Sequence, residues 1–206
     1  MEENENISAI TLGSTFSAVS TSKNWIRFYS QEGNEFFTLG ISEEVVSLAA
    51  HENVLSILYQ PSIPFRGSQN LRMKLFDTTT LRLVSDSSVC VSRDSEAEWF
   101  GFSTKGIPLV KDTLNKVWMY VNEGIWTPVH SINNRFWMVG ATDSDIYGVK
   151  LAYGESVPEP YNSAEPRKIP MKLPFQNKNY ESMALGNIQR ENMRFKQEIW
   201  GHMAGT

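Results

Sequence analysis

Apolar residues occur in short runs along most of the chain, and within a run they alternate with polar residues. Alternation with a period of two places every second side chain on the same face of an extended strand. In residues 25–29, for example, it puts Ile26 and Phe28 on one face. Turn-forming residues separate the runs, among them Gly13-Ser14, 22–24 and 31–34. The pattern before residue 175 therefore predicts antiparallel β-structure.

The predicted strands fall into four successive groups. They are 7–12, 16–20, 25–29 and 36–39; 45–50, 54–59, 71–76 and 81–84; 99–102, 109–111, 117–121 and 125–129; and 136–140, 146–151 and 168–173. Groups of four strands repeated every ~40–55 residues are typical of β-propeller blades. A β-sandwich also consists of short strands with frequent turns, so the repeat alone leaves both folds open. No group closes with the Trp-Asp dipeptide of the commonest propeller repeat.

The C-terminal part of the chain has a different pattern. Residues 154–174 hold five of the nine prolines, which predicts a loop leading into the last strand. From 182 to 200, Ile188, Phe195 and Ile199 lie seven and four positions apart, which predicts an amphipathic helix followed by a fraying tail. We therefore expect an all-β propeller segment of about three and a half to four blades in 1–175, and a helix with its tail in 176–206.

Composition narrows the class of protein. The 206 residues carry a net charge of −4, which gives the chain as a whole no electrostatic attraction to a polyanion. The single cysteine, Cys90, cannot form an internal disulfide and suits a reducing compartment. No apolar run approaches the roughly 20 residues that span a bilayer, and the polar start is no signal peptide. We expect a soluble, intracellular protein that does not bind membranes.

The residues that could carry chemistry do not form a recognisable site. We interpret His51 as a turn residue, His130 as a strand end, His202 as part of the tail and Cys90 as a small packing residue. Their spacing fits no zinc site, and no glycine-rich loop precedes a helix to bind a phosphate. The sequence therefore predicts no catalytic, metal or cofactor-binding residues.

Two further features have both a functional and a structural interpretation. Asp143 and Asp145 flank Ser144 in a predicted turn and could hold a cation, but carboxylates in such turns are more often solvated. Eight aromatic residues could form a stacking platform for nucleobases: Trp99, Phe100, Phe102, Trp118, Tyr120, Trp126, Phe136 and Trp137. Few Lys or Arg residues lie among them, so we expect the rings to form blade cores. Trp126 is predicted to pack between sheets, with Thr127-Pro128 ending its strand. Gly101, between Phe100 and Phe102, is predicted to allow a close approach inside a blade, and Lys105-Gly106 a hairpin turn in which the glycine takes positive φ.

Several motifs follow one another in an order that resembles a known family. They are Glu5 to Gly13 (ENISAITLG), Val45 to His51 (VVSLAAH), Trp99 to Ser103 (WFGFS), Asp112-Thr113, Trp126-Thr127-Pro128, Trp137 to Gly140 (WMVG) and Lys172 to Phe175 (KLPF). This order is similar to the middle, SepB-type propeller of a replisome adaptor family. Its members are known as chromosome transmission fidelity, minichromosome loss or acidic nucleoplasmic DNA-binding proteins. The resemblance runs from about Asn6 to Phe175.

The resemblance implies a six-bladed propeller followed by a helical bundle, in a nuclear, chromatin-associated protein. It also implies that the propeller trimerises and that the bundle docks peptides from DNA polymerase alpha and the replicative helicase complex. Against this pattern, the chain begins at an interior blade and ends after one helix. We therefore assign no peptide-binding residues and expect either a fragment of a longer protein or a chain that needs a partner to close the ring.

The function predicted from the sequence is that of a non-enzymatic scaffold in DNA replication. The alternatives are a propeller enzyme, such as a glycosidase or an esterase, and an unrelated interaction propeller. An enzyme would bring two or more titratable groups together at one mouth of the ring, whereas an adaptor need not. Direct binding of duplex DNA is expected to be weak or absent and, where present, to come from residues 167–196.

Overall fold

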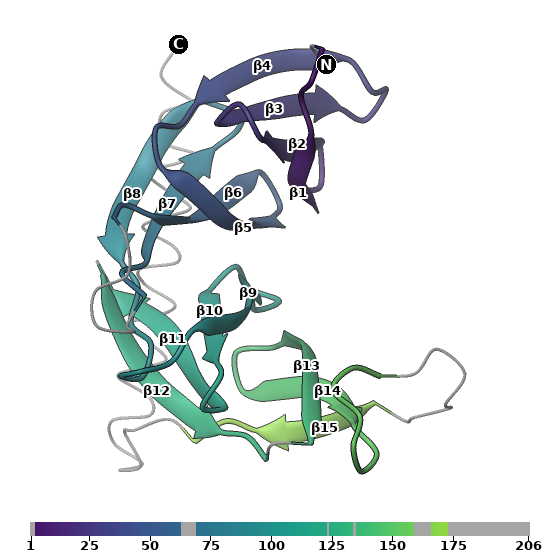
Figure 1. Ribbon diagram of the computed structural model, residues 1–206, viewed down its shortest axis with the longest axis vertical. Helices are drawn as coiled ribbons and strands as arrows, with labels where there is room; N and C mark the ends of the chain where they lie inside the picture. Colours follow the sequence, from purple (N-terminus) through teal and green to yellow (C-terminus); the bar gives the residue numbers. More distant parts are fainter. Residues whose placement is uncertain (1–2, 63–68, 123, 134, 159–165, 173–206) are drawn as a thin grey trace.

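The computed structural model describes residues 3–62, 69–122, 124–133, 135–158 and 166–172 (Figure 1). These residues form strands joined by turns and contain no helix. The predicted helix at 182–200, and with it the division of the chain after residue 175, lies outside the described residues. His202 does so as well.

Fifteen strands make up four antiparallel sheets among the described residues. The first sheet consists of β1 (Ile7–Leu12), β2 (Phe16–Thr21), β3 (Trp25–Ser30) and β4 (Glu35–Gly40). The second consists of β5 (Glu44–His51), β6 (Val54–Gln60), β7 (Arg72–Asp77) and β8 (Arg82–Ser88). The third consists of β9 (Ala97–Phe102), β10 (Pro108–Asp112), β11 (Lys116–Asn122) and β12 (Ile125–Ser131). The fourth has three strands, β13 (Phe136–Ala141), β14 (Asp145–Lys150) and β15 (Arg167–Pro170).

The sheets are the blades of a partial β-propeller, as the strand repeat and the resemblance predicted. Within each sheet the strands pair in the order in which they occur along the chain. The first strands of the blades, β1, β5, β9 and β13, lie along the inner side of an arc, and each contacts the next (Figure 1). The outermost strands β4, β8 and β12 lie on the outer side. A closed two-sheet sandwich is thereby excluded.

Turns between the strands follow from the residues that the sequence supplies there. Asn24, Gly33, Gly106 and Asn115 adopt positive φ between consecutive strands, a conformation that glycine and asparagine tolerate best. Gly106, predicted to end a hairpin turn in this way, donates its amide to the Ser103 carbonyl. The polar turn signals seen in the sequence therefore set where each strand ends.

The hydrophobic core is divided into three clusters, each lying between two neighbouring blades. The first joins Phe16 and Phe28 of the first blade to Ile57 and Phe76 of the second. The second and third blades share a cluster that includes Met73, Leu75, Val110 and Trp126. The third and fourth share another that includes Leu109, Met119, Met138 and Ile146. Because one blade is a single sheet, it buries its apolar face only against its neighbour.

Trp126 occupies the predicted position between blades. Only 9% of its surface is exposed, and its indole N–H donates to the Ser88 carbonyl at 2.9 Å. The predicted end of its strand at Thr127-Pro128 is wrong, because β12 continues to Ser131. Proline is tolerated there because β12 is the outermost strand, where a missing backbone N–H breaks no ladder.

Candidate functional site

Each turn that follows an inner strand joins it to the second strand of the same blade and lies against the neighbouring blade. We call these the inner turns; they comprise residues 13–15, 52–53, 103–107 and 142–144. At the contact between the first and second blades, the Ser14 amide donates to the Glu52 carbonyl at 2.9 Å. Beside it, the Thr15 hydroxyl donates to Asn53 Oδ1 at 2.7 Å. The first blade therefore supplies the donors and the second blade the acceptors.

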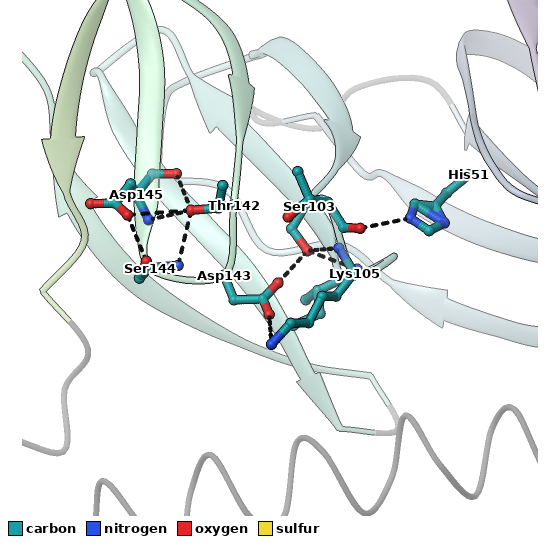
Figure 2. Close-up of polar contacts among 9 residues, drawn as sticks. His51, Ser103, Lys105, Thr142, Asp143, Ser144 and Asp145 are labelled. Atoms are coloured by element: carbon teal, nitrogen blue, oxygen red, sulfur yellow. Dashed lines mark hydrogen bonds and ion pairs between the residues drawn. The ribbon is translucent and has the colours of Figure 1, made fainter.

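His51, the last residue of β5, makes the corresponding contact between the second and third blades (Figure 2). Its Nε2 lies 3.2 Å from the Thr104 carbonyl oxygen, which can only accept, so Nε2 carries the proton. The imidazole packs against Phe102, and a Cβ at Gly106 would lie only 3.2 Å from Nδ1. The interpretation of His51 as a turn residue therefore missed its contact with the neighbouring blade.

A buried serine and a carboxylate join the third and fourth blades (Figure 2). Ser103, only 2% exposed, donates its hydroxyl to Asp143 Oδ1 at 2.8 Å, while the Lys105 ammonium lies 3.0 Å from Oδ2. The Thr104 amide donates to the Ala141 carbonyl at 3.1 Å. The prediction that Asp143 is solvated is wrong, because the turn that carries it lies against the inner turn of the third blade.

Asp145 stabilises the turn on the other side of Ser144 (Figure 2). Its Oδ2 accepts from the Ser144 hydroxyl at 2.6 Å and lies 3.0 Å from the Lys168 ammonium on β15. The Ser144 hydrogen bond and the Lys168 ammonium lower the pKa of this carboxyl. Asp145 is 9% exposed, so it too is not solvated as expected. The two carboxylates interact with separate protein groups and do not converge on a cation site.

This arrangement holds backbone segments together but offers no nucleophile. The Ser103 hydroxyl donates to a carboxylate and accepts from the Ile107 amide at 3.2 Å, while His51 contacts the Thr104 carbonyl instead of the serine. A serine nucleophile needs its hydroxyl next to a general base that can take up the proton. Within the described ranges, no group of three or more His, Cys, Asp or Glu side chains could hold a metal ion.

One face of the first blade does not pack against another blade of the described chain. The β1–β2 register places Ile7, Ile10 and Leu12 on the same face, because Ser8 forms a bulge between Ile7 and Ala9. Ile10 is 63% exposed and Leu12 is 73% exposed. On the opposite face of the blade, Ala18 packs in the cluster shared with the second blade. The innermost strand of the first blade therefore presents aliphatic side chains to solvent.

An ion triad, with Arg27 and Glu5 buried and Glu35 exposed, lies on the same free face of the first blade. Arg27 binds Glu5 through two hydrogen bonds of 2.8 and 2.9 Å, and binds Glu35 at 2.7 Å. The hydrogen bonding to Glu5 is the main reason why the pKa of Arg27 rises further above its ordinary value. Its guanidinium also lies over the Trp25 ring, 5.0 Å from the ring centroid. The triad fixes the segment before β1 onto β3 and β4.

The fourth blade has a free face of different composition. Trp137 pairs with Val149, and Tyr147 lies two residues before Val149, so the three side chains share a face. All three are half-buried. The opposite face, with Met138 and Ile146, packs against the third blade. Trp137 therefore stands apart from the other predicted core aromatics, which lie in or against the inter-blade clusters.

The surroundings of the two remaining candidate residues, Cys90 and His130, indicate packing roles. Cys90 packs beside the cluster between the second and third blades, and burial raises the pKa of its thiol. His130 lies inside β12 with its Nδ1 buried and without a hydrogen-bond partner. Burial, together with the nearby Lys172 charge, lowers the pKa of this imidazole. Neither side chain belongs to a cluster that suggests catalysis.

We call the place where two neighbouring blades meet, with its core cluster and the contact at the inner turn, a joint. The contacts at the joints are the feature that the sequence did not reveal. Ser14, Thr104 and Asp143 each lie two residues after the end of an inner strand, and His51 ends one. The repeat of strands in the sequence gives these residues a common position. It does not show that they contact the neighbouring blade, because that contact exists only once the blades are arranged side by side.

Comparisons with known proteins agree with this architecture. The sequence pattern that defines "Minichromosome loss protein, Mcl1, middle region" matches residues 1–175. The chain is 29% identical over 152 residues to WD repeat and HMG-box DNA-binding protein 1 of Homo sapiens, a match covering 68% of this chain and 13% of that protein. It is 23% identical over 195 residues to Protein ENHANCER OF LHP1 1 of Arabidopsis thaliana, covering 90% of this chain and 20% of that protein. The chain thus spans a small part of the length of these relatives.

The crystal structure of the computationally designed Ika4 protein is similar in fold. It superposes with a TM-score of 0.50 at 10% identity, over 82% of this chain and 93% of that one. No helix in the described part of the chain is long and apolar enough to cross a membrane. The match of the family pattern extends over most of the chain and coincides with the four blades. The chain therefore belongs to the family of the middle region of the minichromosome loss protein Mcl1.

Proposed function

We propose that this chain is a non-enzymatic adaptor segment that acts in DNA replication in the nucleus and whose blades mediate self-association. Membership in the Mcl1 middle-region family supports the replication role. The relatives named for WD repeats and DNA binding support a role at chromatin. The homotrimer and the links to DNA polymerase alpha and the replicative helicase complex are proposals that rest on the resemblance to replisome adaptors.

The single observation that carries self-association is the free face of the first blade. Ile7, Ile10 and Leu12 are more than half exposed on β1, on the face that has no blade of the described chain in front of it. Contiguous exposed apolar side chains on a folded domain favour burial against another surface. The described residues have this exposed aliphatic face and no assembled set of reacting groups. The combination supports association, and not catalysis, as the function.

A propeller enzyme is the function that this proposal rejects. The inner turns carry Ser103, His51 and Asp143, but these groups bind backbone and each other across the joints between blades. We expect no turnover of glycosides, esters or phosphoesters. Measured turnover that disappears on Asp143→Asn, in a variant whose circular dichroism and unfolding midpoint match wild type, would establish an enzyme instead.

Weak binding to duplex DNA is expected from the charge distribution. Arg167, Lys168 and Lys172 lie close together at the end of the described chain, but Lys168 pairs with Asp145. Few phosphate contacts give low affinity and a loss of affinity as salt rises. We therefore propose that partner proteins, and not direct DNA contacts, bring this segment to chromatin.

The experiment is a light-scattering series across protein concentration, run beside a DNA titration at two salt concentrations. The expected result is a mass that rises with concentration, whereas DNA binding stays weak and is reduced further at the higher salt. An Ile10→Asp variant should lower the mass, and Leu83→Asp on the outer strand β8, 53% exposed in the wild type, is the matched control. A strict monomer that binds duplex DNA tightly and independently of salt would contradict the proposal.

A further inference from the structure

The inner turn of the third blade, residues 103–107, contacts both neighbouring blades through the backbone of one residue. The Thr104 carbonyl oxygen accepts from His51 Nε2 of the second blade at 3.2 Å. The Thr104 amide donates to the Ala141 carbonyl of the fourth blade at 3.1 Å. These two groups flank a single Cα atom, so the joint with the second blade and the joint with the fourth blade meet at Thr104.

Hydrogen bonds within this turn hold its residues in one shape. The Ser103 amide donates to the Ile107 carbonyl at 2.8 Å, and the Gly106 amide donates to the Ser103 carbonyl at 3.0 Å. The buried Ser103 hydroxyl accepts from the Lys105 and Ile107 amides at 3.3 and 3.2 Å. Polar groups that are bonded to one another in this way stiffen a segment. We therefore expect the turn to shift as a unit when one of its contacts moves.

Side chains of both neighbouring blades lie against the same turn. On the side of the second blade, the His51 imidazole is so near to Gly106 that a Cβ there would lie 3.2 Å from Nδ1. On the side of the fourth blade, Asp143 accepts from the Ser103 hydroxyl at 2.8 Å and lies 3.0 Å from the Lys105 ammonium. Figure 2 shows His51 and Asp143 on opposite sides of the turn. A displacement of either blade therefore acts on the turn directly.

The strand that follows the turn, β10, is packed on both of its faces. Leu109 lies in the cluster shared with the fourth blade, whereas the next residue, Val110, lies in the cluster shared with the second. Both side chains are fully buried. Close-packed interiors have low compressibility and transmit strain. The third blade therefore cannot yield at one joint without changing the packing at the other.

We propose that the inner turn of the third blade is a coupling element, which transmits a displacement at the joint with the second blade to the joint with the fourth. A partner that binds the second blade and shifts it would thereby alter the fourth blade without touching it. Coupling between two sites is reciprocal, so a shift of the fourth blade would equally alter the contact at His51. The coupling lies within one chain and is independent of the proposed self-association.

A double-mutant cycle in the 206-residue chain tests the coupling. His51→Ala removes the contact from the second blade, Asp143→Ala removes the contact from the fourth, and urea denaturation gives the unfolding equilibrium constant of each variant. Substitutions at independent sites multiply to within about a factor of two. Coupled contacts weaken each other when either is lost. The unfolding constant of the double variant should therefore be at least about fivefold smaller than the product of the two single effects predicts.

Asp145→Ala is the matched control for Asp143→Ala. Asp145 is a carboxylate on the same blade, two residues away, but it binds Ser144 and Lys168 of its own blade. His51→Ala combined with Asp145→Ala should therefore multiply to within about a factor of two. His51→Gln, whose side-chain amide can still donate to the Thr104 carbonyl, should restore part of the coupling with Asp143→Ala.

The His51 ring provides a second measurement, made on the folded protein. Donation to the Thr104 carbonyl holds the proton on Nε2, so the ring nitrogen NMR signals of the neutral imidazole should be those of that tautomer. Asp143→Ala should shift them toward a mixture of tautomers, whereas Asp145→Ala should leave them unchanged.

Three results would each overturn the coupling: single effects of His51→Ala and Asp143→Ala that simply multiply, an equal deviation in the control pair with Asp145→Ala, or a His51 ring that does not respond to Asp143→Ala. Should Asp143→Ala fail to fold, Asp143→Asn takes its place in both measurements, because it keeps the shape of the side chain and removes the charge that pairs with Lys105. The same three results would then decide.

Discussion

The joint between the first two blades and the joint between the last two are held together by different kinds of side chain. At the first, aromatic rings fill the space: Phe28 lies 6.1 Å from Phe16 and 5.6 Å from Phe76, between ring centroids. The polar contact there, Thr15 with Asn53, is exposed. At the last, methionine and aliphatic side chains fill most of the core beside a single buried ring, Phe136, and a Ser103–Asp143 contact joins the turns.

The difference separates two contributions to a joint: the stability that apolar burial supplies and the geometry that the polar contact fixes. Burial of apolar area supplies stability at every joint and tolerates either aromatic or aliphatic residues. The polar contact at the inner turn contributes less energy and fixes how one blade meets the next. Because a buried polar group costs free energy when it loses its partner, the last joint depends on its polar contact more than the first.

The largest expected effect is the loss of the aromatic centre of the first joint. Phe28 is fully buried and contacts rings on three strands, so Phe28→Ala should lower the free energy of unfolding by an amount near the top of the ~3–5 kcal/mol range for large aromatic truncations. Urea denaturation followed by tryptophan fluorescence measures it. A loss below about 1 kcal/mol would show that the first joint does not depend on its aromatic core.

A somewhat smaller effect is expected between these two joints, at Trp126. Trp126→Ala removes a large side chain that is still 9% exposed, so the loss should fall in the lower part of the same ~3–5 kcal/mol range. Trp126→Phe is the matched control, because it keeps an aromatic ring in the cluster while it removes part of the indole and the hydrogen bond to the Ser88 carbonyl, which is worth about 0.5–1.5 kcal/mol. Equal losses for both variants would show that the hydrogen bond, and not packing, holds the indole.

The polar contacts give the most direct comparison of the two joints. Ser103→Ala removes a buried hydroxyl that bonds Asp143 and the Ile107 amide, and should cost about 1–3 kcal/mol. Thr15→Ala removes the corresponding exposed contact and should change stability by no more than about 0.5 kcal/mol. Both values come from the same denaturation experiment. A Thr15 effect as large as that of Ser103 would remove the distinction between the joints.

The smallest effect concerns acid stability of the fourth blade. The pKa of Asp145 is lowered in the folded protein, first by the Ser144 hydrogen bond and then by Lys168. The ionised carboxylate therefore stabilises the fold above its unfolded pKa of about 3.9, and this contribution disappears as pH falls through the folded value. Asp145→Asn should differ from wild type at neutral pH and approach it below pH ~4. Glu96→Gln, at an exposed carboxylate, is the control; the same pH profile for both variants would rule out the Asp145 contribution.

Strand positions could be predicted from the sequence because the information is local. Alternation of apolar residues and the turn residues between them placed the strands to within a few residues, as for 7–12, found as β1. The largest error was at 81–84, where β8 continues to Ser88 through Ser85, Asp86 and Ser87. Those polar residues extend the strand because an outermost strand faces solvent and its pairing with β7 does not require apolar side chains.

Close approaches inside a blade were only partly predictable. Gly101 was expected to permit a close contact, and a Cβ there would lie 2.8 Å from the Trp99 ring. The partner is therefore an indole two residues earlier on the same strand, a detail that depends on the rotamer of Trp99. The expected positive φ at Gly106 was confirmed, because hairpin turns require that conformation irrespective of tertiary contacts.

The sequence alone determined the repeat of strands, the aromatic character of the cores and the family to which the chain belongs, because each is written in local order and spacing. The tertiary structure decided which side chains meet across blades. His51, Ser103 and Asp143 come from three different blades, and no spacing along the chain places them at successive joints. The same holds for Ile10 and Trp137. The alternation of apolar and polar residues shows only that each of these side chains lies on one face of its sheet. Only the arrangement of the blades shows that their faces lack a neighbour within the described chain, because burial depends on what lies in front of a strand.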